Sequence, residues 1–537
     1  MTSTPRYLLI LPVLFGGALC AALSATQPAR VVERAALTHG TAIVDPAALR
    51  ELDGGRFSLA RMLAQGTSAD KSNDAPLADR ELFALPSMLA VRKALEADFD
   101  RYVEKHEATV PNESIGVGSA FDFQLFDRAL LDASDARFVL SGIVNRMDRA
   151  YVSEKNCGEI RLIYRMTRTG AAKIGELDVS PRLPMTLNIV LKAKGDDSDH
   201  AGGGAITCAE IARRWLAAGE LTSTGAELAE KLTAKGGALD LIAPENIYRM
   251  ETNLQIAHVP KSATHEFRTD YLMKVFDYDA SSATFQEAVL ENQIDRDRLL
   301  ADENLRREFK TWLLDPSHFN ELDRGTLLIP DQFLAKSAIA PTPIGFSASE
   351  MQPAFGLVQG EDQTDNPVFS ESDVVTALQN ATEHGVDLQN IHSAAGFERR
   401  LNDITCGGCH QTRGIGGFHF PGVDWMAAKP DNSVVVPASP HFFGDQVRRR
   451  DIITAFADGK MPDFSRGFAS RPQSRGSSEL AGTEYEDGWG AHCYAPSEHP
   501  AETDKSFASW TCAEGLSCQV MSRTSRMGMC FIKTRPD

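Results

Sequence analysis

The sequence predicts a multi-domain α+β protein: a mixed α+β main domain, then a mostly α-helical unit, then a small cysteine-rich module. Three observations favour this class. The chain has 537 residues with 43% apolar content, too many for one ordinary core. Helix-like and strand-like patterns alternate irregularly rather than in a strict βαβ repeat. Four of the nine cysteines lie between positions 493 and 530, in a segment with too little apolar content to fold without disulfides.

Residues 1–25 predict a secretory signal peptide. Arg6 precedes an apolar run over positions 7–23, and small residues follow it. A membrane anchor is the alternative and needs about 20 apolar residues, but Gly16, Gly17 and the alanine-rich end favour cleavage. No later segment is apolar enough to span a bilayer. We therefore expect a bacterial protein that is periplasmic or secreted, with no membrane span after cleavage.

The main domain is expected at residues 76–340, after a weakly structured lead-in at 26–75. An amphipathic helix over 79–105 is interrupted at Pro86, because proline disrupts helical hydrogen bonding. Runs of β-branched and large apolar residues predict antiparallel strands at 137–148, 159–165, 186–194, 254–259 and 271–277. Helical spacing predicts further helices at 208–218, 225–234 and 299–314.

Composition sets the remaining boundaries. Proline, glycine, glutamine and aspartate dominate residues 341–372, which predicts a linker. A helical unit is expected at 373–480, with a helix over 442–457, and the cysteine-rich module at 481–537. There is no internal repeat.

The formal net charge of −18 excludes nucleic acid as a partner, since a phosphate backbone would be repelled over most of the surface. The one basic run, at positions 448–450, is expected on the solvated face of a helix, with a patch for an acidic redox partner as the alternative.

The cysteine count favours an oxidising compartment. Cys20 leaves with the signal peptide and two cysteines belong to the motif described next, so an even six remain for three disulfides. Cys157 is expected to pair with Cys208, because the other four lie together at the C-terminus. The connectivity of those four stays open.

Residues 406–410 read C-x-x-C-H, the attachment sequence of a c-type haem. On a helical turn the two thiols share one face and can bond to the porphyrin, while the adjacent imidazole reaches the iron. We therefore expect one covalent haem c, held by Cys406 and Cys409 with His410 as axial ligand. A zinc-binding thiol pair lacks a second ligand pair in the sequence, and a redox dithiol is less consistent with His410. Phe397, Leu401 and Ile404 form an apolar helical stripe that leads into the motif.

The residues after this motif resemble the class I cytochrome c pattern, in which a helix precedes a turn with a methionine ligand. The matching residues are Gly459, Lys460, Met461, Pro462 and Phe464. This resemblance implies Met461 as the distal ligand of the haem iron. Alternatively, Met461 is an ordinary core residue. The distal ligand is then His419 or His441, or the sixth position of the iron is open.

A wider resemblance covers most of residues 138–460. Segments 144–148, 157–161, 327–333 and 401–421 look like a group of large exported proteobacterial proteins with a single C-x-x-C-H. That group is functionally uncharacterised, so the resemblance implies export and haem but no substrate.

Charged residues on the predicted strands form a weaker candidate site. Arg146, Asp148, Glu159 and Arg161 could bind a substrate, but cross-strand ion pairs are the commoner arrangement. We predict ion pairs here and assign no catalytic residue.

These observations predict an electron-transfer protein that meets a redox partner protein. Two alternatives stay open. One is a haem-dependent oxidase or peroxidase that takes a small-molecule substrate at an open sixth position, because some 300 residues precede the haem region. The other is a surface binding protein in which the haem is structural.

Overall fold

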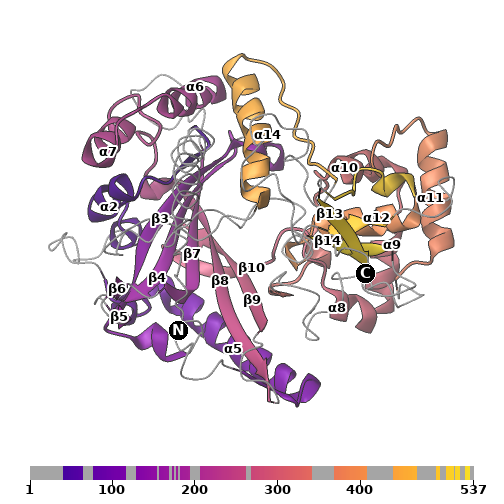
Figure 1. Cartoon of the computed structure of the whole chain (residues 1–537), viewed down its shortest axis with the longest axis horizontal. Helices are drawn as coiled ribbons and strands as arrows, with labels where there is room; N and C mark the ends of the chain where they lie inside the picture. The colour runs from indigo at the N-terminus through magenta and orange to yellow at the C-terminus, as the bar shows by residue number, and fades with distance from the viewer. Residues whose placement is uncertain are drawn as a thin grey trace, which may run out of the picture.

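The structure is a computed structural model, and Figure 1 shows a large sheet-containing unit beside a smaller helical unit. It describes residues 40–63, 77–115, 128–153, 156–168, 172–174, 177–179, 182–193, 206–261, 268–341, 368–407, 440–468, 492–495, 504–512, 515–520 and 526–532. Helices and antiparallel strands occur together, which confirms the predicted α+β class.

The larger unit is built on a nine-stranded antiparallel sheet. Its main path runs β1 (Ala42–Ile43), β3 (Ala136–Arg146), β4 (Glu159–Arg168), β7 (Arg182–Lys192), β8 (Ile247–Pro260), β9 (Arg268–Asp279) and β10 (Thr284–Ala288). β2 (Glu113–Ile115) pairs with β8, and β11 (Ala338–Pro341) pairs with β9. A separate hairpin joins β5 (Ala172–Ile174) to β6 (Leu177–Val179). All five strands predicted from sequence are present, as β3, β4, β7, β8 and β9.

Helices that pack against the sheet complete one large core. The predicted interrupted helix is confirmed as α4 (Asp79–Leu82), a 3-10 turn at Pro86–Met88 and α5 (Leu89–Thr109). The two later helices are confirmed as α6 (Cys208–Gly219) and α7 (Gly225–Thr233). Buried side chains of these helices, among them Val91, Leu95 and Trp215, join those of the strands in a single apolar cluster.

The lead-in differs from its expected weak structure. It contains β1, α2 (Pro46–Gly54) and α3 (Leu59–Leu63). Asp45 caps α2 by accepting a hydrogen bond from the Ala48 N–H, and Leu49 and Phe57 are buried in the main core. Short elements such as these are stabilised by tertiary burial rather than by their own propensity, so the local pattern is weak.

The smaller unit packs five helices around a second core. They are α8 (Arg296–Ala301), α9 (Glu303–Leu313), α10 (Phe319–Arg324), α11 (Glu371–Glu383) and α12 (Ala394–Asp403). The helix predicted over 299–314 is divided, because Asp302 ends α8 and caps α9 by accepting from the Asn304 and Leu305 N–H groups. This core draws on both sides of the predicted linker, most of which lies outside the described residues. The predicted domain boundaries stay predictions.

The helix predicted over 442–457 is confirmed as α14 (Pro440–Ala457), and it returns to the larger unit (Figure 1). It packs on α6 and on the 3-10 turn η5 (Met147–Val152), and Ile453 enters the main core. The basic run on this helix was expected to be solvated. Arg448 and Arg449 are instead buried, and only Arg450 is exposed.

The cysteine-rich module contains a three-stranded sheet in the order β12 (His492–Tyr494), β14 (Met527–Ile532), β13 (Leu516–Val520). Its disulfides join Cys493 to Cys518 and Cys512 to Cys530. In the larger unit, the predicted disulfide between Cys157 and Cys208 is confirmed and ties the start of β4 to α6.

Among the described residues, every helix is too short or too polar to span a lipid bilayer.

We expect the Cys157–Cys208 disulfide to stabilise the sheet unit, since it closes a span of 51 residues. Restricting a loop of this length in the unfolded chain contributes about 4 kcal/mol. Replacing both cysteines by serine should lower the urea midpoint of the sheet-unit transition, followed by circular dichroism. The matched control is Cys512→Ser with Cys530→Ser, which removes a disulfide from the separate three-stranded sheet and should leave that transition in place. Equal midpoints for wild type and the Cys157/Cys208 variant would contradict the expectation.

Candidate functional site

The segment that leads into C-x-x-C-H is a firmly anchored helix. Ser393 caps α12 by accepting a hydrogen bond from the Gly396 N–H at 2.9 Å. Phe397, Leu401 and Ile404 are all buried in the core of the helical unit, which confirms the predicted apolar stripe. The packing of this stripe fixes the backbone directly before Cys406.

Cys406 lies where the helical unit meets the edge of the sheet. Its thiol donates to the Glu291 carbonyl oxygen at 3.5 Å, and the Gly407 N–H donates to Gln293 Oε1 at 2.8 Å. The Cys406 side chain, half-buried, packs against a small apolar cluster formed by Met273, Val275, Leu290, Ala338 and Ala340. Cys406, the first residue of the motif, is therefore held between α12 and strands β9 and β11.

Several predicted site residues lie outside the described part of the chain. These are Cys409, His410 and His419. His441 falls in the first turn of α14, but its side chain is also outside the described set. Their roles stay predictions.

Met461 is described, and its side chain is 88% exposed. It follows α14 in a turn that Gly459 makes possible with a positive φ of 68°, where the Lys460 N–H donates to the Ala455 carbonyl. Phe464, further along, packs on Tyr151 and Phe456. The turn is thus anchored by Phe464 while Met461 faces solvent, so ligation of a haem iron by Met461 would require the side chain to turn inward.

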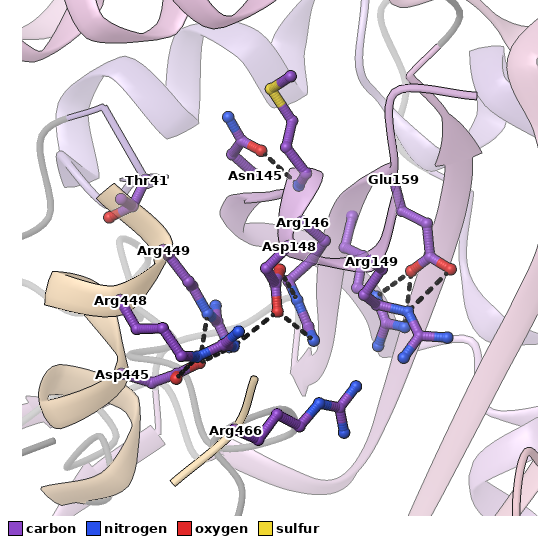
Figure 2. A network of polar contacts seen from close by, with 12 residues as sticks. Thr41, Asn145, Arg146, Asp148, Arg149, Glu159, Asp445, Arg448, Arg449 and Arg466 are labelled. Atoms are coloured by element: carbon purple, nitrogen blue, oxygen red, sulfur yellow. Dashed lines mark hydrogen bonds and ion pairs between the residues drawn. The ribbon is translucent and has the colours of Figure 1, made fainter. Parts of the chain in front are cut away.

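A buried network of ion pairs begins at Glu291, the residue whose carbonyl meets Cys406. The Arg149 guanidinium donates to the Glu291 carboxylate, with Nη1 to Oε1 at 3.1 Å, and its Nε lies 3.0 Å from Glu159 Oε1. Glu159 also accepts from Arg161, which reaches on to Glu251 at 2.8 Å. Figure 2 shows Arg149 and Glu159 side by side at the end of the sheet.

The second half of the network links the sheet to α14 (Figure 2). Arg146 donates to both carboxylate oxygens of Asp148, at 2.8 and 3.2 Å. Arg448 reaches across from α14 to the same carboxylate at 3.0 Å and also pairs with Asp445, as does Arg449. Arg448 and Arg449 are therefore turned toward η5 and away from solvent.

Ion pairs form among Arg146, Asp148, Glu159 and Arg161, as predicted, but the cross-strand arrangement expected for them is wrong. Each pair joins residues two apart in the sequence, Arg146 with Asp148 and Arg161 with Glu159. Glu159 and Arg161 are alternate residues of β4 and lie on the same face of the strand, whereas Asp148 lies in η5 directly after β3.

Arginine and carboxylate charges hold each other ionised in this buried network. Burial would raise the pKa of Asp148, but the Arg146 charge, followed by those of Arg449 and Arg448, keeps it well below 3.8. Burial would likewise raise the pKa of Glu159, and Arg149 and Arg161 lower it. Burial lowers the pKa of Arg146 to about 10 in spite of Asp148, which still leaves the guanidinium charged at pH 7.

The charges of the network do not cancel. Its six arginines are Arg146, Arg149, Arg161, Arg448, Arg449 and Arg466, and its five carboxylates are Asp148, Glu159, Glu251, Glu291 and Asp445. Arg466 joins through its charge on Glu291 and a hydrogen bond to the Tyr151 hydroxyl. Within the described residues, Arg448 Nη1 and Arg466 Nε are buried and have no hydrogen-bond partner. A buried donor of this kind is costly unless an anion or water meets it.

A cavity of about 420 Å³ opens beside Glu291, between the sheet edge and the helical unit. Its lining is mixed, with polar residues such as Arg249, Asp277, Asn292 and Lys336 beside apolar ones such as Leu328. It offers room for a small polar molecule next to the residue that contacts Cys406.

Sequence reasoning missed most of this network. Arg146 and Arg161 were recognised, with Asp148 and Glu159, because they fall on or beside neighbouring predicted strands. The spacing of Asp445, Arg448 and Arg449, three and four apart on one helix, also indicates a paired face. Nothing local connects Arg149 to Glu291, which is 142 positions away.

This chain matches no protein-family model, no curated protein and no solved structure.

We expect Asp148→Asn to destabilise the protein by about 3 to 5 kcal/mol at pH 7, because it leaves buried arginine charge uncompensated. The folded pKa of Asp148 lies below its unfolded value, so this stabilisation is present above about pH 3.9 and is lost as the pH falls toward the folded pKa. Urea unfolding of both proteins between pH 3 and pH 8 measures the difference. Asp458→Asn, at an exposed pair with Lys460, is the matched control and should change little. A loss no larger than that of the control would show that the pair is unimportant.

Proposed function

We propose that this protein is an exported c-type haem protein that transfers electrons through one haem, attached at Cys406 and Cys409 with His410 as axial ligand. The observation that carries the proposal is the complete C-x-x-C-H sequence at the end of an anchored helix. The three disulfides use six cysteines, and none of the six belongs to this motif.

The surroundings of Cys406 fit a porphyrin. An apolar macrocycle needs apolar side chains near its attachment point, and Cys406 packs on such a cluster at the sheet edge. The two propionates of a haem need cationic hydrogen-bond donors, and Arg149 of the arginine-rich network binds Glu291, whose carbonyl oxygen contacts Cys406. The apolar contacts of Cys406 and the nearby arginine charge both support the proposal.

When bound, the haem supplies one-electron chemistry at iron. The residues of the chain hold it and tune its surroundings. The α12 stripe fixes the first thiol, and the Gln293 amide oxygen holds the backbone of the following glycine. Buried guanidinium groups near the haem would stabilise added negative charge and so favour the reduced state.

Disulfides support the proposed compartment. All three persist only where thiols are oxidised, as in the bacterial periplasm or outside the cell. The same compartment is where a c-type haem is expected to be attached in bacteria, so the two inferences agree.

We expect the haem of the wild-type protein to stay with the polypeptide during extraction with acidified organic solvent, because thioether bonds survive acid. Cys406→Ser with Cys409→Ser should release all colour into the solvent. The matched control, Cys512→Ser with Cys530→Ser, also removes two cysteines and should retain it. Release of the colour from the wild type would refute covalent attachment.

A second candidate, a haem-dependent oxidase or peroxidase, is favoured by two observations. Met461 is 88% exposed, which supports a sixth position without methionine. The cavity beside Glu291 could admit a small-molecule substrate.

We expect Met461→Leu to leave the ferric absorption spectrum unchanged, since the methionine side chain faces solvent. The ferrous wild type should then bind carbon monoxide promptly, which stopped-flow absorption measures. A methionine–iron band that disappears in Met461→Leu would instead establish Met461 as the distal ligand and favour a closed electron carrier.

A further inference from the structure

A second polar cluster lies away from the haem motif, buried between α5 and the sheet. It contains His106 on α5, Glu113 on β2, and His258 on β8, all buried. Asp270 on β9 and Tyr102 on α5 complete it. None of these residues belongs to the haem-site network described above.

His106 is the unusual member. Its side chain is completely buried, yet neither ring nitrogen has a hydrogen-bond partner. A neutral imidazole carries one N–H donor and one lone pair, and leaving both unmet in the interior costs about 1 to 3 kcal/mol for each group. Glu113 Oε2 lies 3.5 Å from His106 Nε2, too far for a good hydrogen bond.

That separation is the one a shared metal ion would impose. Ligands about 2.0 to 2.1 Å from a tetrahedral ion are about 3.3 Å apart. The candidate ligand atoms of His106, Glu113 and His258 all lie within 4.8 Å of one another. His258 Nδ1 is also in close contact with Glu113 Oε2, so both histidines face the same carboxylate.

The far side of His258 has the partner that a metal-bound histidine needs. His258 Nε2 lies 3.4 Å from Asp270 Oδ2, and the Tyr102 hydroxyl donates to the same oxygen at 2.8 Å. A carboxylate behind a histidine orients the ring and increases its basicity toward a metal at the other nitrogen. Asp270 is thus a positioning residue rather than a ligand.

We propose that His106, Glu113 and His258 form a buried site for a divalent first-row transition metal ion, of the zinc type. Two imidazoles and one carboxylate suit such an ion, and three protein ligands leave one position of a tetrahedral set for water. The ion would join α5, β2 and β8, and so would fasten the short strand β2 to the sheet.

The group of Cys493, Cys512 and Cys518 also has metal-ligand spacing but carries no such proposal. Each of these sulfurs is already in a disulfide.

The test uses the full-length protein, stripped with a chelator and then titrated with Zn²⁺ or Co²⁺. We expect about one ion per chain, absorption bands typical of tetrahedral Co²⁺, and a melting temperature that falls on stripping and recovers with Zn²⁺. Zinc is counted separately from haem iron by elemental analysis, so failure here would not bear on the haem.

His106→Phe should weaken zinc binding by at least about tenfold and make the melting temperature insensitive to the chelator. His384→Phe, at an exposed histidine, is the matched control and should behave as wild type. If His106→Phe does not fold, zinc binding is measured on Glu113→Gln instead, which should also bind zinc more weakly than wild type. The cobalt spectrum of the wild type then provides the second measurement. A wild type that takes up neither ion, or a His106→Phe variant that binds zinc as well as wild type, would overturn the proposal.

Discussion

Buried arginines and carboxylates pair at the end of the sheet, and this pairing connects the sheet to α14 and to the helical unit. Five carboxylates and six arginines lie in surroundings where an unpaired charge would be costly. Asp148 forms ion pairs with Arg146, at the end of β3, and with Arg448, on α14. Arg149 forms an ion pair with Glu291, which precedes the helical unit in the chain. These ion pairs join segments that are far apart in the sequence. They therefore fix the positions of the sheet, α14 and the helical unit relative to one another.

The position of the haem motif follows from that arrangement. Glu291 holds Arg149 with its side chain and meets Cys406 with its carbonyl, so one residue connects the ion pairs to the attachment site. Cys406 packs against an apolar cluster and is linked through Glu291 to the buried arginines, and the proposed porphyrin with its propionates would need both environments. Under the proposed function, the large sheet unit would supply the apolar edge and most of the charge.

Local sequence patterns predicted the individual helices and strands better than the way these elements pack together. The strands carry continuous runs of β-branched residues, and α12 has an apolar stripe, so β3, β4, β7, β8, β9 and α12 could be read directly. The 40–63 segment could not, because Leu49 and Phe57 gain their burial from distant strands. The basic run at 448–450 was misplaced for the same reason: its carboxylate partner Asp148 is 300 positions away, and only the fold brings them together. The cluster of His106, Glu113 and His258 also depends on sheet pairing that no spacing reveals.

The mass of the intact, mature protein under denaturing conditions shows whether a haem is covalently attached. Covalent attachment predicts a polypeptide heavier by the mass of one haem, with the addition confined to the peptide that contains Cys406 and Cys409. A denatured chain at its bare polypeptide mass would contradict the account, whatever colour the native protein shows.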